Sequence, residues 1–208
     1  MARYIDAVCR LCRREGEKLF LKGTKCNTEK CTVSKRPTLP GQHGQSRSKL
    51  SNYGLQLRQK QKVKRMYGVL EKQFRKYFKI ASKTKGVTGK VLLQLLERRL
   101  DNVIFRMGLA TSRAQARQIV RHNFVYVNSK RTNIPSYLID KDDIVQLKAK
   151  DKAKNKIKEN IEQAKDRTIP SWLEMDSVEL KAKILRLPEK EDITATIQEQ
   201  LIVELYSK

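Results

Sequence analysis

The feature that most constrains this chain is a long basic stretch with no compensating acid. From Lys30 to Leu70 there are ten Lys or Arg residues and no carboxylate. Residues 1–100 hold 26 basic and 6 acidic side chains, whereas residues 101–208 hold 20 and 16. Self-repulsion of this kind disfavours a compact state unless a polyanion neutralises it, and a surface that needs only solubility mixes both signs. The first half of the chain is therefore predicted to bind phosphates.

Length and hydropathy exclude several other classes of protein. The 208 residues suffice for one large domain or two small ones. No run approaches the roughly 18 apolar residues of a membrane span, and the start MARYIDAVCRLC lacks the apolar region of a secretory signal. The basic stretches also lack the bulky apolar anchors of a membrane-surface protein. We therefore expect a protein of the reducing cytoplasm with no membrane partner.

The four cysteines form two closely spaced pairs near the start of the chain, Cys9-x2-Cys12 and Cys26-x4-Cys31. In a reducing compartment such spacings indicate metal ligands more often than disulfides. Two pairs complete a tetrahedral site without an open position, which predicts a structural zinc ion, with an iron–sulfur cluster as the alternative occupant. Two inert pairs of free thiols are the other alternative. His43, in PGQHGQ, is a rival ligand, but it is expected instead to contact RNA or to pack in its loop.

Hydrophobic periodicity predicts helices first and mixed structure later. Apolar residues at three- and four-residue spacing indicate helices over 50–67, 71–82 and, after a cap at Thr88, 90–100. Before them, residues 32–49 are rich in Pro, Gly and Ser and are expected to be extended, ordering only on a partner.

After residue 123 the period shifts towards two. Short antiparallel strands are predicted in FVYVN, KRTNIP, YLI and DIVQLKAK. Residues 151–167 indicate a charged surface helix, and an irregular stretch is expected to begin at Trp172 and Leu173. The final segment, ITATIQEQLIVELYSK, is typical of an amphipathic helix.

One predicted helix lies in SRAQARQIVRHNFVYVN, residues 112–128, and is expected to be capped by Ser112. Ile119 and Val120 would face a core. Arginines recur at every fourth position, so that they spread over only about 80° of the helix circumference, at Arg113, Arg117 and Arg121. We interpret them as an exposed ridge that binds RNA; a merely solvated face is the alternative.

The segment RRLDNVIFRMGLATSRAQARQIVRHNFVYVNSKRTNIPSYLI resembles the RNA-binding module named after small-subunit ribosomal protein four. That module pairs two small helices with a short curved sheet, and RNA backbone lies along the second helix and the following turn. The start MARYIDAVCRLCRREG, the loop PGQHGQ, the segment KQKVKRMYG and the ending LRLPEKEDI…QLIVELYSK extend the resemblance to the ribosomal protein four family along essentially the whole chain. The cysteines match the metal-binding branch of that family.

Three turns depart from the pattern of the family. Asn123-Phe124 replace Gly-His, and because Asn tolerates the left-handed conformation this turn should survive. Asn128-Ser129 replace Asn-Gly, and since Ser tolerates positive φ poorly, a different turn type or strain is expected. Lys141-Asp142-Asp143 replace a pattern that ends in Gly-Asp.

The resemblance implies an α+β fold with three parts. Residues 1–48 would form an arm stapled by a metal ion on its four cysteines, followed by a basic extended segment. Residues 49–97 would form a helical domain, completed by 168–208 when the C-terminal helix returns to it. Residues 98–167 would form an inserted RNA-binding domain, with two helices on a short antiparallel sheet and a trailing charged helix.

The resemblance also implies a function without catalysis or a small-molecule substrate. Members of the family are structural constituents of the small ribosomal subunit in the cytoplasm. They bind a multi-helix junction in the 5′ domain of the small-subunit rRNA, nucleate assembly, and contribute to translational accuracy where mRNA enters the subunit. Ribosomal protein five and mRNA are the other implied partners. A repressor acting on its own mRNA is the alternative role.

An enzyme and a DNA-binding zinc protein are the competing classes. Pseudouridine synthases and tRNA synthetases share the module, but they need a catalytic domain, for which no segment is left over. Asp101 is the only carboxylate in the helical half of the module and is expected to cap a helix or to pair with Arg98. No catalytic residue is therefore predicted.

The residues expected to contact RNA fall on three basic surfaces, with Tyr4, His43 and Tyr53 as candidates to stack on bases or simply to pack. The first surface is the arm, with Arg3, Arg10, Arg13, Arg14, Lys22, Lys30, Lys35, Arg36, His43, Arg47 and Lys49. The second is the helix after it and its surroundings, with Tyr53, Arg58, Lys60, Lys62, Lys64, Arg65, Lys72, Arg75 and Lys85. The third lies in the module, with Ser112, Arg113, Gln115, Arg117, Arg121, His122, Asn128, Lys130 and Arg131.

Overall fold

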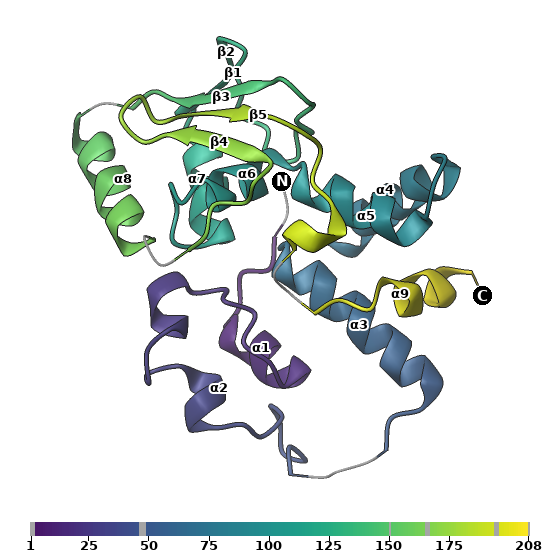
Figure 1. The fold of residues 1–208 in the computed structure, drawn as a ribbon. Coiled ribbons are helices and arrows are strands. Elements are labelled where there is room, and N and C mark those ends of the chain that lie inside the picture. The colour runs from purple at the N-terminus through teal and green to yellow at the C-terminus, as the bar shows by residue number, and fades with distance from the viewer. Residues whose placement is uncertain (1–2, 46–48, 150, 165–166, 194–195, 208) are drawn as a thin grey trace. The chain divides into compact units, whose positions relative to one another are not determined.

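A computed structural model describes residues 3–45, 49–149, 151–164, 167–193 and 196–207. The chain divides into two compact units: unit 1 comprises Met1–Leu92 and Ala195–Lys208, and unit 2 comprises Leu93–Thr194. Unit 1 is helical, and unit 2 combines helices with a sheet (Figure 1), which confirms the expected α+β class. In the part of the chain that the structure describes, none of the helices has the length and apolar character needed to span a bilayer.

Unit 1 contains two short helices and then longer ones. The short helices are α1 (Cys9–Glu15) and α2 (Thr32–Lys35), with a 3₁₀ turn at Gly23–Cys26 between them. The longer helices are α3 (Asn52–Met66) and α4 (Glu71–Lys83). They confirm the helices that hydrophobic periodicity predicts over 50–67 and 71–82. The helix α5 (Thr88–Glu97) begins in unit 1 and ends in unit 2.

The core of unit 1 is completed by the end of the chain. The helix α9 (Glu199–Tyr206) lies along α3 (Figure 1). The Tyr206 ring stacks on Phe78, with 4.5 Å between ring centroids, and on Phe74 at 6.2 Å. Because Phe74 and Tyr77 are buried on the inner face of α4, these aromatic contacts fix α9 to the unit. The expected return of the C-terminal helix is confirmed.

Unit 2 is built on an antiparallel sheet with three helices. The described strands are β1 (Val125–Val127), β2 (Lys130–Arg131), β3 (Ile144–Leu147), β4 (Leu173–Asp176) and β5 (Lys181–Ile184), in the order β2-β1-β3-β5-β4. The helices are α6 (Leu100–Arg106), α7 (Arg113–Arg121) and α8 (Asp151–Gln163). Figure 1 shows α6 and α7 beneath the sheet. Ile119 and Val120 lie in the buried core of this unit, as predicted for the inner face of α7.

The sheet is larger than the sequence predicts. The chain after Trp172 is not irregular, because β4 and β5 add two strands, and Ala182 of β5 pairs with Val145 of β3. The segment YLI contributes only one isolated bridge, between Leu138 and Arg99. The expectation that all of residues 168–208 complete the helical domain is therefore wrong for β4 and β5. Each strand has only four residues, and the side chains on its outer face are polar. An alternating pattern of this length is too short to identify a strand from the sequence.

The unusual turns keep the left-handed geometry of the family pattern. Asn123 has φ +65°, which confirms that Asn sustains the first turn, and Asp142 has φ +63°. Asn128 (φ +48°) and Ser129 (φ +66°) are both left-handed, as a type I′ hairpin requires. The turn type is thus retained, and Ser129 carries the strain. The Asn128 side chain supports the turn by donating to Asp143 Oδ1 at 2.7 Å and accepting from the Ile144 N–H at 2.9 Å.

Candidate nucleic-acid interface

The arginine ridge on α7 is interrupted because its middle member is buried. Arg117 is 8% exposed, and its Nη1 lies 3.8 Å from Asp101 Oδ2. Asp101 also accepts from Arg99, at 2.6 Å to Oδ2 and 3.0 Å to Oδ1. Arg98 pairs with Asp140 instead, so the expected Arg98–Asp101 pair is wrong. The expectation that Arg117 is exposed is also wrong, since a buried carboxylate holds it at the edge of the apolar face.

The first member of the ridge is held within unit 2 as well. Arg113 Nε donates to Asn102 Oδ1 at 2.8 Å, and its guanidinium lies 4.5 Å from the centre of the Phe105 ring. Arg167, which the sequence did not indicate, lies 4.6 Å from the same ring. These contacts align α6 and α7 and leave Arg113 only partly exposed.

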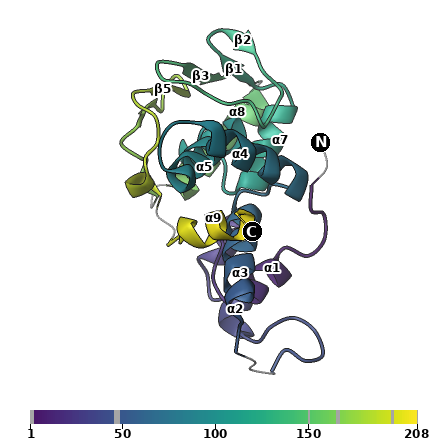
Figure 2. The same cartoon turned by 90° about the vertical axis from the view of Figure 1, so that its right-hand side faces the viewer.

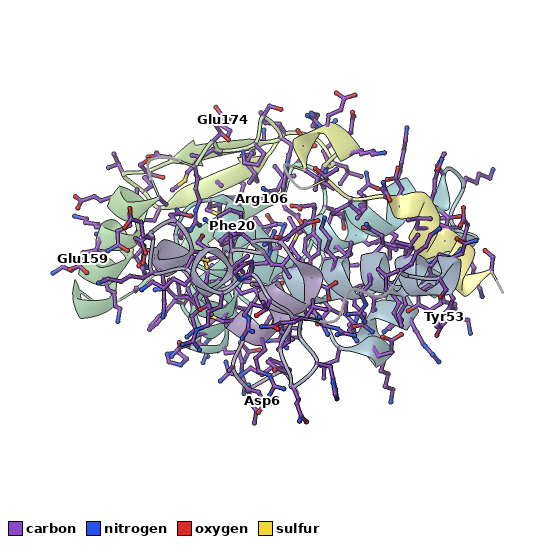
Figure 3. All side chains as sticks on the ribbon, turned by 90° about the horizontal axis from the view of Figure 1, so that it is seen from below. Asp6, Phe20, Tyr53, Arg106, Glu159 and Glu174 are labelled. Carbon is purple, nitrogen blue, oxygen red and sulfur yellow. The ribbon has the colours of Figure 1, made fainter. Side chains whose placement is uncertain are left out.

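Buried polar contacts fix the rest of this helical layer. Arg106 donates to both oxygens of Glu97, at 2.8 and 3.0 Å, and Asn102 donates to Glu97 Oε2 at 2.6 Å. The Arg106 side chain is only 11% exposed, whereas Glu159 projects outward from α8 (Figure 3). A bidentate guanidinium–carboxylate pair has a defined geometry, so the layer that carries the module is rigid.

Two residues that are expected to contact RNA organise α7 in the structure. Ser112 caps the helix, as predicted, by accepting from the Gln115 N–H at 3.3 Å. The Gln115 side chain accepts from the Thr111 N–H at 2.7 Å and donates to Asn160 Oδ1 at 3.2 Å. The cap of Ser112 is confirmed, and the amide of Gln115 is occupied by these internal hydrogen bonds.

Several exposed cations of the module lie at the end of α7 and on the β1–β2 hairpin. We call the exposed side chains of Arg121, His122, Lys130 and Arg131 the hairpin surface. Its three Lys and Arg side chains form no ion pair with any residue that the structure describes. The hairpin stands out from the edge of the sheet (Figures 1 and 2). Cations on a protruding turn are accessible to a phosphate backbone.

The cations of α3 do not form the exposed surface that was expected. Lys60 and Lys64 donate to the two oxygens of Glu71 at 3.0 and 3.1 Å, and Tyr206 donates to Glu71 Oε1 at 2.9 Å. Burial alone would raise the pKa of Glu71, but these three hydrogen bonds outweigh it and lower the pKa to about 2. Glu71 is therefore fully charged at neutral pH and offsets part of the positive charge on one side of α3.

Cations on the other side of α3 pair with carboxylates at the end of α1 and just after it. Arg58 and Arg65 both pair with Glu15, the first at 3.4 Å, and Lys62 lies 2.6 Å from Glu17. Burial raises the pKa of Glu15, and the two arginines oppose that effect. A count of charge along the sequence missed these pairs because the carboxylates lie outside the basic stretch. The expectation of a phosphate-binding surface on α3 is thus corrected.

The cysteine segment is compact. Cys12, Cys26 and Cys31 are buried, and Cys9 is partly exposed. Burial, and then the other three thiols, raises the pKa of Cys12, while a backbone hydrogen bond from Leu19 lowers it. The four thiols are thus close enough to interact electrostatically. Among the residues that the structure describes, no three His, Cys, Asp or Glu side chains are already arranged to hold a metal ion.

The loop after the cysteines is folded back and not fully extended. Arg13 Nε donates to the Thr38 carbonyl at 2.9 Å and its Nη2 to the Leu39 carbonyl at 3.3 Å. At Gly44 an added Cβ would lie 2.1 Å from the Leu39 carbonyl oxygen, so only Gly allows this approach. The expectation of an extended segment is therefore corrected by the short helix α2 and this loop.

Most other predicted residues of the arm are exposed. Tyr53, at the start of α3, projects outward (Figure 3), and Arg47 lies outside the described residues. The exposed set comprises Arg3, Arg10, Arg14, Lys22, Lys30, Lys35, Arg36, His43 and Lys49.

Both parts of the chain match known protein families. Residues 3–97 match the family described as Ribosomal protein S4/S9 N-terminal domain, and residues 98–145 match the S4 domain. Small ribosomal subunit protein uS4 of Acetivibrio thermocellus is 58% identical to the chain over 208 residues, with 100% of each chain covered. The uS4A protein of Alkaliphilus oremlandii is 60% identical over the same full lengths. The chain belongs to the ribosomal protein uS4 family.

The uS4 family consists of ribosomal structural proteins and is not an enzyme family, which agrees with the prediction that the chain has no catalytic residue. The S4 domain match, residues 98–145, includes α6, α7, β1 and β2 and ends within β3. The strands β4 and β5 lie after that match, although they belong to the same sheet.

Additional cations lie on α4, just after it and on α5, in the part of the chain that matches the Ribosomal protein S4/S9 N-terminal domain. Lys72, Arg75 and Lys85 are exposed, and they were selected from the sequence. The sequence also contained the signal for others, because lysines recur there at helical spacing with aromatic residues between them. The exposed lysines that were missed are Lys76, Lys79, Lys83 and Lys90.

Proposed function

We propose that this uS4-family protein is a structural component of the small subunit of the cytoplasmic ribosome and binds its rRNA directly. The observation that carries this proposal is the hairpin surface on an S4 domain, whose exposed Lys and Arg side chains have no ion-pair partner among the described residues. Phosphates that bind such cations release counterions, which makes the affinity dependent on salt. A-form RNA hides its major-groove edges, so recognition rests on backbone and shape.

Binding to a transcript of the small-subunit 5′ domain tests this proposal. The variant Arg121→Gln/Lys130→Gln/Arg131→Gln should bind more weakly and reduce the slope of log affinity against log salt by roughly 2 to 3. A matched variant, Lys154→Gln/Lys156→Gln/Lys158→Gln on α8, removes the same charge from another exposed surface of unit 2. Equal effects of the two variants, or a wild-type protein that does not bind the transcript, would contradict the proposal.

The finer parts of the proposal concern a branched RNA target. Exposed cations occur on both compact units, which suits a junction of several helices in the 5′ domain better than a single duplex. We propose that binding there nucleates assembly, and that contacts with ribosomal protein five and with mRNA where it enters the subunit contribute to accuracy. Footprinting on naked rRNA tests the first part: protection of only one helix would contradict it.

We also propose that Cys9, Cys12, Cys26 and Cys31 hold a structural zinc ion. Three of the four thiols are buried, burial raises the pKa of Cys12 and Cys26, and the Lys22 N–H donates to Cys26 Sγ at 3.4 Å, an environment suited to thiolates once a cation offsets their charge. Zinc would crosslink the arm. The sulfur atoms must converge for this, so binding includes local rearrangement.

Metal analysis and cobalt substitution test the zinc site. One zinc per chain, and thiolate-to-cobalt absorption that is lost in Cys26→Ser/Cys31→Ser, are expected. Iron with inorganic sulfide in the purified protein would instead indicate the iron–sulfur alternative. Absence of both metals from protein prepared without chelator would refute the proposal.

A further inference from the structure

The segment between the two cysteine pairs contains a backbone conformation that is rare for its residue type. Phe20 has φ +51°, in the left-handed region, where the Cβ of a bulky residue lies too close to the following carbonyl oxygen. Phe20 (Figure 3) is 49% exposed, so burial of its ring does not account for this conformation. The left-handed Leu180 differs, because it is 3% exposed in the core of unit 2.

Two backbone amides next to Phe20 donate to cysteine sulfur atoms. The Leu19 N–H donates to Cys12 Sγ, and the Lys22 N–H donates to Cys26 Sγ at 3.4 Å. One donor precedes Phe20 and the other follows it, and each reaches a different cysteine pair. A single short segment therefore supplies hydrogen bonds to both halves of the proposed zinc site.

The left-handed backbone is what allows both hydrogen bonds to form. A change in φ at Phe20 turns the chain before it relative to the chain after it, so the two N–H groups cannot then both point at their sulfur atoms. The segment is fixed on both sides, since Leu19 is 2% exposed and Gly23 is buried with φ +64°. An unfavourable φ persists where the surrounding structure determines it in this way, and such positions are frequent at functional sites.

The two hydrogen bonds have a chemical role when a metal ion is bound. Four cysteine thiolates give a divalent ion a net negative charge, and an N–H group that donates to a thiolate stabilises that charge. Groups that hold metal ligands from outside the coordination sphere orient the ligand and tune the affinity for the metal. Cys12 and Cys26 are buried, so water competes little for their sulfur atoms.

We propose that Phe20 is a positioning residue of the zinc site, whose left-handed backbone directs the Leu19 and Lys22 amides at the thiolates of Cys12 and Cys26. This inference rests on the proposed zinc site and deepens it. The property required at position 20 is tolerance of positive φ, and the aromatic ring itself is dispensable.

Substitutions at position 20 of the full-length protein separate the backbone from the ring. Zinc affinity is measured by competition with a chromogenic chelator for Phe20→Gly, Phe20→Asn, Phe20→Leu and Phe20→Val. Gly and Asn accept positive φ, so these two variants should bind zinc as tightly as wild type or more tightly. Phe20→Leu, which is unbranched at Cβ, should stay close to wild type. Phe20→Val is β-branched and should bind about 10–100-fold more weakly.

The opposite order would overturn the proposal. If the ring acts by shielding the site from water, Phe20→Leu and Phe20→Val should keep most of the affinity, whereas Phe20→Gly and Phe20→Asn should lose it. Circular dichroism of the metal-free variants is the control for folding, because the helices α3 and α4 lie outside the substituted segment and should keep their signal.

Nuclear magnetic resonance of wild type loaded with cadmium-113 gives a measurement that needs no variant. We expect scalar coupling from the metal, through sulfur, to the amide protons of both Leu19 and Lys22. Absence of coupling at either amide would overturn the positioning role. If wild type binds neither zinc nor cadmium, the proposed zinc site itself fails. If it binds them and affinity follows the size of the side chain at position 20, only the role of the Phe20 backbone is overturned.

Discussion

The hydrogen-bond cluster around Glu71 predicts a stability that depends on pH. Replacing Glu71 with Gln removes a carboxylate whose pKa is lowered to about 2 in the folded protein, from 4.5. That difference corresponds to at most about 3.4 kcal/mol, at roughly 1.36 kcal/mol per pKa unit. The side chain is 33% exposed, and solvent screening reduces the expected loss to about 1.5–2 kcal/mol.

The direction of the pH dependence follows from the lowered pKa. The folded protein holds a proton on Glu71 less tightly than the unfolded chain does, so the stabilisation is fully present above about pH 4.5. It is lost as the pH falls towards 2. The free energy of unfolding of wild type should therefore exceed that of Glu71→Gln at neutral pH, and the two values should converge in acid.

Urea unfolding followed by circular dichroism measures both quantities. Wild type and Glu71→Gln are compared at several values between about pH 7 and pH 3, the range in which the difference should shrink. Tyr206→Phe removes one hydrogen bond to Glu71 while keeping the ring that stacks on Phe78, and it should show a smaller loss. A difference between wild type and Glu71→Gln that stays constant with pH would refute the electrostatic explanation.

Three further predictions follow from buried and strained positions. Arg117→Ala should lower the free energy of unfolding by about 1–3 kcal/mol, since Arg117 is buried against Asp101, whereas Arg121→Ala should change stability by less than about 0.5 kcal/mol and weaken RNA binding. Ser129→Gly should raise the melting temperature, because φ +66° costs a non-glycine residue about 1 kcal/mol; an unchanged value would argue against strain. Phe74→Ala should cost about 3–5 kcal/mol in urea unfolding as a fully buried ring.

Local signals in the sequence identified most helices and one cap. Ser112 precedes a helix whose third residue supplies the N–H that it caps, and the aromatic spacing of α4 identifies its buried face. Both depend on residues within one or two turns. The strands β4 and β5 could not be found in this way, because their stability comes from pairing with β3, a segment distant in sequence.

Long-range ion pairs account for the errors in the predicted surfaces. Arg58 and Arg65 lie 43 and 50 residues from Glu15, the carboxylate that they bind. A local count of charge therefore treated them as available for phosphate. The prediction for Arg117 was wrong for a related reason. Its spacing in the sequence placed it beside the apolar face of α7, but only the folded structure shows that Asp101 lies next to it. The lysines of α4 face solvent, so their spacing along the sequence is sufficient to predict that they are exposed.

Unit 1 is built from two segments that are far apart in the sequence, and this has a consequence while the chain is being synthesised. Residues Ala195–Lys208, which belong to that unit, leave the translating ribosome after the rest of it. Until they emerge, Phe74 and Phe78 of the nascent chain lack the ring of Tyr206 that packs on them. We therefore expect a polypeptide that terminates before Tyr206 to leave this aromatic surface open to proteases and chaperones.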